Sequence, residues 1–159
     1  MSPFVLAQEA TPKIDGAHAP EDVAAIQKVV ADAVDNGWGK FDVPATMAEY
    51  TSGAYWINAY GIEKEGKEEI EKFVTRIFAA PGMRHRKQLP LVFKSIKFIR
   101  PDIALVHTRQ DTTDQLKSDG TPEGERKSHV FRIMLKQEGK WLTDTFQVLD
   151  ERPGVIKKP

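Results

Sequence analysis

The chain changes its hydrophobic period near its midpoint, and this change limits the folds that it can adopt. Up to Pro81, apolar residues recur at the spacing of amphipathic helices, whereas from Leu91 onward they alternate as in strands. The stretch Ala54 to Phe73 contains both periods, and the switch falls at Gly61 and Gly66. Helices followed by strands predict an α+β protein with its helices packed on one face of a curved antiparallel sheet.

We expect three helices in the first half of the chain. The first begins at Pro20, whose following acidic residues suit a first turn, and ends at Asn36-Gly37. A short second helix has Pro44 in its first turn, and a third runs from about Gly66 to Pro81. A strand from Ala54 to Tyr60 precedes the third helix.

The second half is predicted to contain four strands, over residues 91–99, 103–114, 127–137 and 140–150. Glu138-Gly139 is typical of a two-residue hairpin turn, which pairs Gln137 with Lys140. Counting outward, Leu135 faces Leu142, Ile133 faces Asp144, Phe131 faces Phe146 and His129 faces Val148. This face is the more apolar, so we expect it to line the interior. On the same criterion we assign to it four residues of the preceding strand, Ile103, Leu105, His107 and Arg109.

The length of 159 residues suits one domain, which we place at residues 21–150. Residues 1–20 are expected to be a disordered tail and linker, and residues 151–159 a loose end. The segment "FVLA-QEA" resembles the end of a secretory signal, so an exported and a cytoplasmic location are both open. No apolar run approaches the ~20 residues of a membrane helix.

Composition excludes several classes of function. Lys plus Arg and Asp plus Glu both number 23, so the formal net charge of zero favours neither nucleic acid nor a membrane surface as a partner. The absence of cysteine excludes disulfides, thiol catalysis and thiolate metal sites. Phosphate loops and dinucleotide fingerprints are absent too, so we expect no cofactor.

Three segments resemble a known family. "NAYGIEKEGKEEI", "SIKFIRPDIALVH" and "EGKWLTDTFQ" are similar, in order and spacing, to marks of the SnoaL-like proteins of the nuclear-transport-factor-two-like superfamily, and most similar to the branch named for SgcJ and EcaC. The resemblance covers Asp22 to Asp150. It implies a cystatin-like cone of three helices wrapped by a curved antiparallel sheet, with a pocket inside, and homodimers formed through the outer sheet face. Members include isomerases, dehydratases, cyclases, hydrolases and binding modules, so the fold alone does not give the function.

Asp144 is the strongest candidate for a catalytic residue. On the predicted face it lies among apolar side chains, where desolvation disfavours the charged form of a carboxylate and lets it act as a general acid or base near neutral pH. The alternatives are a salt bridge to Arg109 or Arg132, or an inverted face assignment.

His107 and His129 are the other catalytic candidates, as proton partners on neighbouring strands. A metal site with His85 is the alternative, but no carboxylate stands at the close spacing that such sites use, so we predict no metal.

Six residues are expected to contact a ligand: Asn58, Trp56, Tyr60, Arg109, Phe131 and Phe146. The amide of Asn58 can hydrogen-bond a ligand oxygen but cannot take up a proton. The aromatic residues either stack on a flat ligand or belong to the core. The basic cluster "RHRK", Arg84 to Lys87, either attracts an anionic group to the pocket mouth or is solvated surface.

The ketosteroid isomerases share the implied cone. By our alignment their catalytic Asp falls on Asn58, and the Tyr and protonated Asp of their oxyanion hole fall on Val30 and Phe131. All three groups are absent, so that mechanism is not expected. The aldol-cyclase members use an acid on the last strands, for which Asp144 is the counterpart.

Three hypotheses follow. The first is a domain that binds an apolar small molecule with one polar end, with or without cofactor-free isomerisation, dehydration or cyclisation by acid/base chemistry. The second is a non-catalytic dimeric module that binds a ligand or a protein. The third is a structural dimer with a filled cone.

Overall fold

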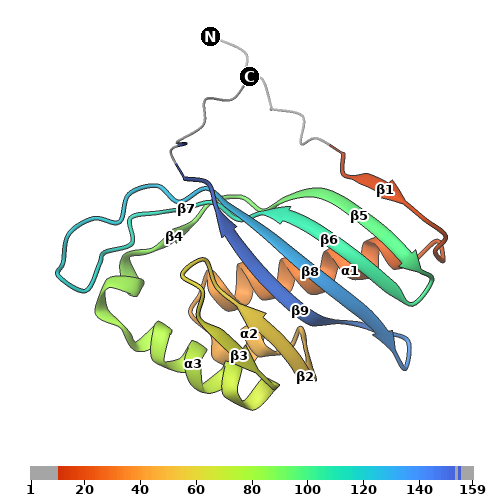
Figure 1. The fold of residues 1–159 in the computed structure, drawn as a ribbon, viewed down its shortest axis with the longest axis horizontal. Helices are drawn as coiled ribbons and strands as arrows, with labels where there is room; N and C mark the ends of the chain where they lie inside the picture. The colour runs from red at the N-terminus through yellow and green to blue at the C-terminus, as the bar shows by residue number, and fades with distance from the viewer. Residues whose placement is uncertain (1–10, 153, 155–159) are drawn as a thin grey trace, which may run out of the picture.

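The computed structural model describes residues 11–152 and Gly154, and it has the predicted α+β architecture. Within these residues, seven strands form one curved sheet in the order β1-β5-β6-β8-β9-β2-β3, and a second small sheet pairs β4 with β7. The helices lie on one side of the large sheet, with α3 beside β2 and β3 (Figure 1).

The strands are β1 (Lys13–Asp15), β2 (Tyr50–Ile57), β3 (Glu63–Glu65), β4 (Lys87–Gln88), β5 (Val92–Arg100), β6 (Ile103–Arg109), β7 (Thr112–Thr113), β8 (Ser128–Gln137) and β9 (Lys140–Asp150). The helices are α1 (Asp22–Ala31), which continues as a π-helix over Asp32–Trp38, α2 (Val43–Met47), α3 (Lys67–Ala79) and a 3-10 turn over Pro81–His85. None of the helices in this part of the chain is long and apolar enough to cross a membrane.

The β8–β9 hairpin begins as predicted. Glu138 and Gly139 have φ angles of 51° and 78°, the positive values that a tight two-residue turn needs. The pairs Gln137–Lys140 and Leu135–Leu142 follow on either side of it.

A bulge at Asp144 then shifts the register of this hairpin. Met134 pairs with Thr143 and Ile133 pairs with Thr145, which leaves Asp144 as the extra residue. The predicted pairs beyond this point are therefore wrong, and the observed pairs are Phe131–Gln147 and His129–Leu149.

The face assigned to the interior is wrong for β6 and β8 as well. On β8 the buried residues are Ser128, Val130, Arg132 and Met134, and on β6 they are Ala104, Val106 and Thr108. On β9 the bulge changes which residues are buried, because Trp141 and Thr143 precede it and Phe146 follows it. The inner face of β9 therefore contains odd-numbered residues before the bulge and even-numbered residues after it. A simple count of alternating residues does not predict this change.

The core has two parts. Ile26 and Val30 of α1 pack with Trp141 and the buried residues of β5 and β6. Ile70, Val74 and Phe78 of α3 pack with residues of β2, β8 and β9. The Trp141 indole donates to Asp22, and this bond ties the start of α1 to the sheet at 2.9 Å.

The edges of the sheet differ from the prediction. β1 pairs in parallel with β5 through Lys13–Asp15. These residues lie in the stretch that was expected to be a disordered linker. The signal-like segment falls outside the described residues. β2 begins at Tyr50 because α2 already ends at Met47, and it pairs in parallel with β9, so the sheet is mixed rather than wholly antiparallel. Glu151, expected in the loose end, bonds to Arg109 and His129.

Candidate functional site

A cavity of about 280 Å³ lies between α3, the end of β2 and the inner faces of β8 and β9. Its apolar wall is formed by Trp56, Phe73, Ile77, Val130, Phe146 and Val148. The volume is just under the range of about 300–1,000 Å³ that is typical of small-molecule sites. An engineered cavity of about 150 Å³ binds benzene, so this cavity suits a ligand of about two rings.

The wall is held by aromatic contacts between strands. Trp56 of β2 pairs with Phe146 of β9, and their rings stack with centroids 5.8 Å apart at an angle of 8°. Phe73 of α3 meets the Trp56 ring edge-on, at 5.4 Å. These rings make one side of the cavity flat and firmly packed.

Polar side chains interrupt this wall: Asn58, Arg86, Gln110, Thr112, Gln115, Arg126 and Ser128. Arg126 is neutralised, because its Nε and Nη2 lie 3.0 and 2.9 Å from Oδ2 of Asp150. The Ser128 hydroxyl donates to the other oxygen of the same carboxylate, at 2.6 Å. Arg126 and Ser128 are therefore both bonded to the same carboxylate, that of Asp150.

Asn58 holds the turn between β2 and β3. Its Oδ1 accepts hydrogen bonds from the backbone N–H groups of Tyr60 and Ile62, both at 2.9 Å. The chain turns here because Gly61 has a φ of 78°, as expected from its position after the strand. The amide nitrogen of Asn58 remains as a donor at the cavity wall.

Tyr60, beside Asn58, also lines the cavity. Its hydroxyl donates to Glu123, and partial burial together with this carboxylate raises the pKa of Tyr60 to about 12. The phenol therefore stays protonated at neutral pH and cannot serve as a base there.

The structure brings Trp56, Asn58, Tyr60 and Phe146 to the cavity, as expected for ligand contacts; binding by them stays a prediction. Four of the other predicted site residues, His107, Arg109, His129 and Phe131, alternate with the buried residues of β6 and β8 and so lie on the opposite face of the sheet.

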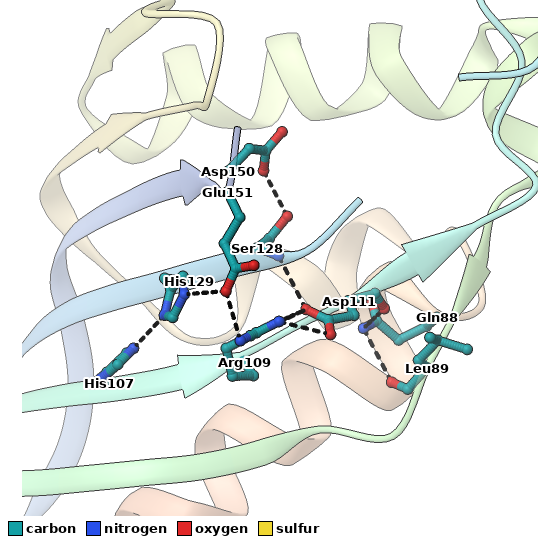
Figure 2. Close-up of polar contacts among 9 residues, drawn as sticks. All are labelled: Gln88, Leu89, His107, Arg109, Asp111, Ser128, His129, Asp150 and Glu151. Atoms are coloured by element: carbon teal, nitrogen blue, oxygen red, sulfur yellow. Dashed lines mark hydrogen bonds and ion pairs between the residues drawn. The ribbon is translucent and has the colours of Figure 1, made fainter. Parts of the chain in front are cut away.

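On that face the two histidines and Arg109 form a polar chain with Glu151 and Asp111 (Figure 2). His107 Nε2 lies 2.9 Å from His129 Nδ1, and His129 Nε2 lies 3.0 Å from a Glu151 oxygen. Arg109 bonds to the same oxygen and to Asp111, at 3.0 Å each. The expected rim of His and Arg around the pocket is therefore found on the outside of the sheet.

Asp144 does not line the cavity either. It is half-buried at the bulge, and its Oδ1 accepts a hydrogen bond from the Thr51 hydroxyl at 3.1 Å. Arg109 and Arg132, its alternative partners, bind other carboxylates, those of Asp111 and Glu49.

No carboxylate or imidazole is among the described residues that line the cavity. The same part of the chain contains no cluster of three His, Cys, Asp or Glu side chains that could hold a metal. The chemistry that the cavity offers is apolar contact plus hydrogen-bond donors and acceptors.

Six polar residues of the cavity are not among the contacts expected from the sequence: Arg86, Gln110, Thr112, Gln115, Arg126 and Ser128. Arg86 belongs to the basic cluster "RHRK", which is the one feature of the sequence that could indicate it. The other three residues of the cluster, Arg84, His85 and Lys87, are exposed, as expected of a solvated surface. The two glutamines and Arg126 follow β6 in irregular segments, where no periodic pattern indicates which side chains face inward.

No family model and no curated protein matches the chain. Solved structures do. A Caulobacter vibrioides protein with a cystatin-like fold has a TM-score of 0.74 at 19% identity, over 84% of this chain and 92% of that one. A ketosteroid isomerase-like protein of Erwinia carotovora atroseptica has a TM-score of 0.68 at 18% identity, over 85% and 100%. An NTF-2 like protein of Shewanella oneidensis has a TM-score of 0.61 at 18% identity, over 81% and 99%. The chain therefore has the cystatin-like fold of the nuclear-transport-factor-two-like proteins.

Proposed function

We propose that this protein binds a small, mostly apolar molecule with one polar end inside the cone. The observation that carries the proposal is the cavity of about 280 Å³, with its stacked aromatic wall and its few polar groups. Sites of this composition, apolar with a small number of placed polar groups, are the usual form of small-molecule sites. The resemblance to the SnoaL-like branch named for SgcJ and EcaC supports the same reading.

Binding without acid/base catalysis is the favoured form of this function. Isomerisation, dehydration and cyclisation need a group that moves a proton within hydrogen-bond reach of the substrate. The described cavity wall offers arginines, amides, hydroxyls and indoles, none of which is a general base at neutral pH. A catalytic role for Asp144, His107 or His129 would require a substrate held outside this cavity.

A thermal-shift screen tests the proposal with steroids, aromatic polyketides, fatty acids and aryl carboxylates. A ligand at about a hundred times its dissociation constant adds ~2.7 kcal/mol to the free energy of unfolding. Val148→Phe, which fills part of the cavity, should abolish the shift, and Ile99→Phe on β5 is the matched control because Ile99 is 57% exposed. A shift retained in Val148→Phe, or no shift with any class, would contradict the proposal.

A homodimer through the outer sheet face is the second part of this proposal. Ile133 of β8 and Leu149 of β9 are 37% and 48% exposed, and a second copy of the chain would cover them. Sedimentation equilibrium should give twice the 17.9 kDa of the chain, and Ile133→Lys should reduce the mass to that of one chain. A monomeric wild-type protein would contradict the dimer and leave the cavity proposal intact.

A further inference from the structure

Arg86 lines the cavity and has no carboxylate partner among the described residues. Its Nη1 donates to the backbone oxygen of Trp38 at 3.2 Å, and its Nη2 donates to Oε1 of Gln88 at 2.6 Å. Both acceptors are neutral. A guanidinium has five N–H groups, so these two bonds leave three of them for another partner.

Three other arginines with limited exposure are paired. Arg109, Arg126 and Arg132 bind Asp111, Asp150 and Glu49, respectively. Arg86 is partly buried, and burial, with Arg126 nearby, lowers its pKa to about 10. It remains a cation at neutral pH, in a place where an unpaired charge is unfavourable.

The position of Arg86 is fixed by its neighbours. The amide nitrogen of Gln88 donates to the backbone oxygens of Leu89 and Asp111, both at 3.2 Å, so its Oε1 is left to face the guanidinium. The guanidinium lies over the Trp38 ring, 5.7 Å from its centroid. The guanidinium is therefore held in place before any ligand arrives.

We propose that the ligand of this cavity is a singly charged organic anion, an aryl or alkyl carboxylate of about two rings in size, whose carboxylate pairs with Arg86. This inference rests on the proposed function. A planar carboxylate matches the fork of a guanidinium. A phosphate dianion would bring a second negative charge. Among the described residues of the cavity wall there is no second unpaired cation for it, because Arg126 is already paired with Asp150.

The test compares naphthoate with naphthylmethanol, a neutral molecule of nearly the same shape, by isothermal titration calorimetry on the full chain. Naphthoate should bind at least tenfold more tightly to the wild-type protein. Arg86→Gln should remove this preference by weakening naphthoate at least tenfold and leaving naphthylmethanol unchanged. Arg84→Gln, at an exposed neighbouring position, should change neither affinity.

The outcomes separate the two proposals. Equal affinity for both molecules in the wild-type protein, or a preference that survives Arg86→Gln, overturns the anion inference and leaves the apolar cavity as the binding site. If neither these molecules nor any class of the thermal-shift screen binds, both proposals fail. The wild-type comparison decides the matter even if Arg86→Gln does not fold.

Discussion

Arg132 and Glu49 form an ion pair in which both side chains are fully buried, with Nε of Arg132 donating to Oε2 of Glu49 at 2.7 Å. The Thr143 hydroxyl donates to the same oxygen, also at 2.7 Å, and the guanidinium lies 4.9 Å from the centroid of the Phe146 ring. The pair therefore joins the start of β2 to β8 and supports a ring of the cavity wall from behind.

Glu49→Gln should destabilise the protein strongly. The change leaves the Arg132 charge buried without a counter-charge, and loss of one member of a buried pair typically costs about 3–5 kcal/mol. Urea unfolding measures this, with Glu71→Gln on the exposed face of α3 as the control. A loss below about 1 kcal/mol, equal to that of the control, would show that the pair does not hold the fold.

Deleting Asp144 should leave the cavity in place, as should Asp144→Ala. The deletion removes only the extra residue of the bulge, so β9 would alternate regularly and Phe146 and Val148 would keep their present face. Each change loses one hydrogen bond, from Thr51, worth about 0.5–1.5 kcal/mol. Thermal unfolding monitored by circular dichroism compares the two variants, and a melting temperature of the deletion far below that of Asp144→Ala would contradict this account of the bulge.

His107 should make the protein less stable at acidic pH. Burial, followed by the nearby His129, Lys94 and Arg109, lowers the pKa of His107 in the folded state. The unfolded chain therefore binds this proton at a higher pH than the folded one, so the free energy of unfolding falls as the pH drops through the ordinary histidine value of about 6.5.

His107→Phe tests this dependence and keeps a ring to stack on Phe131, whose centroid lies 4.3 Å from that of His107. The difference in free energy of unfolding between pH 7.5 and pH 5.5 should be smaller in this variant. His85→Phe, at an exposed position, should retain the wild-type difference. An unchanged difference in His107→Phe would remove His107 as its source.

The fold could be predicted from the sequence because local signals agreed with it. The helical stripes that bring Ile26 and Ile70 into the core, and the Glu138-Gly139 turn, each depend on residues close together in the chain. The bulge at Asp144 depends instead on how β9 fits β2 and β8 at the same time, which no local pattern records. That one residue changes which residues of β8 share a face with Phe146.

The candidate site was predicted in part. Trp56, Asn58 and Tyr60 line the cavity because the strand and the glycine after it fix their position, and ligand binding by them stays a prediction. Arg86 was missed as a cavity residue because its burial follows from contacts with Trp38 and Gln88, which are not periodic features of the sequence.

The three tryptophans offer the most direct test of binding inside the cone. The rings of Trp38 and Trp56 line the cavity, while Trp141 lies in the other part of the core, with its indole bound to Asp22. Two-dimensional proton–nitrogen NMR resolves one indole N–H signal from each. Addition of naphthoate, or of another hit from the screen, should shift the Trp38 and Trp56 signals and leave that of Trp141 in place. Three unmoved signals at saturating ligand, or a shift of Trp141 alone, would contradict binding in this cavity.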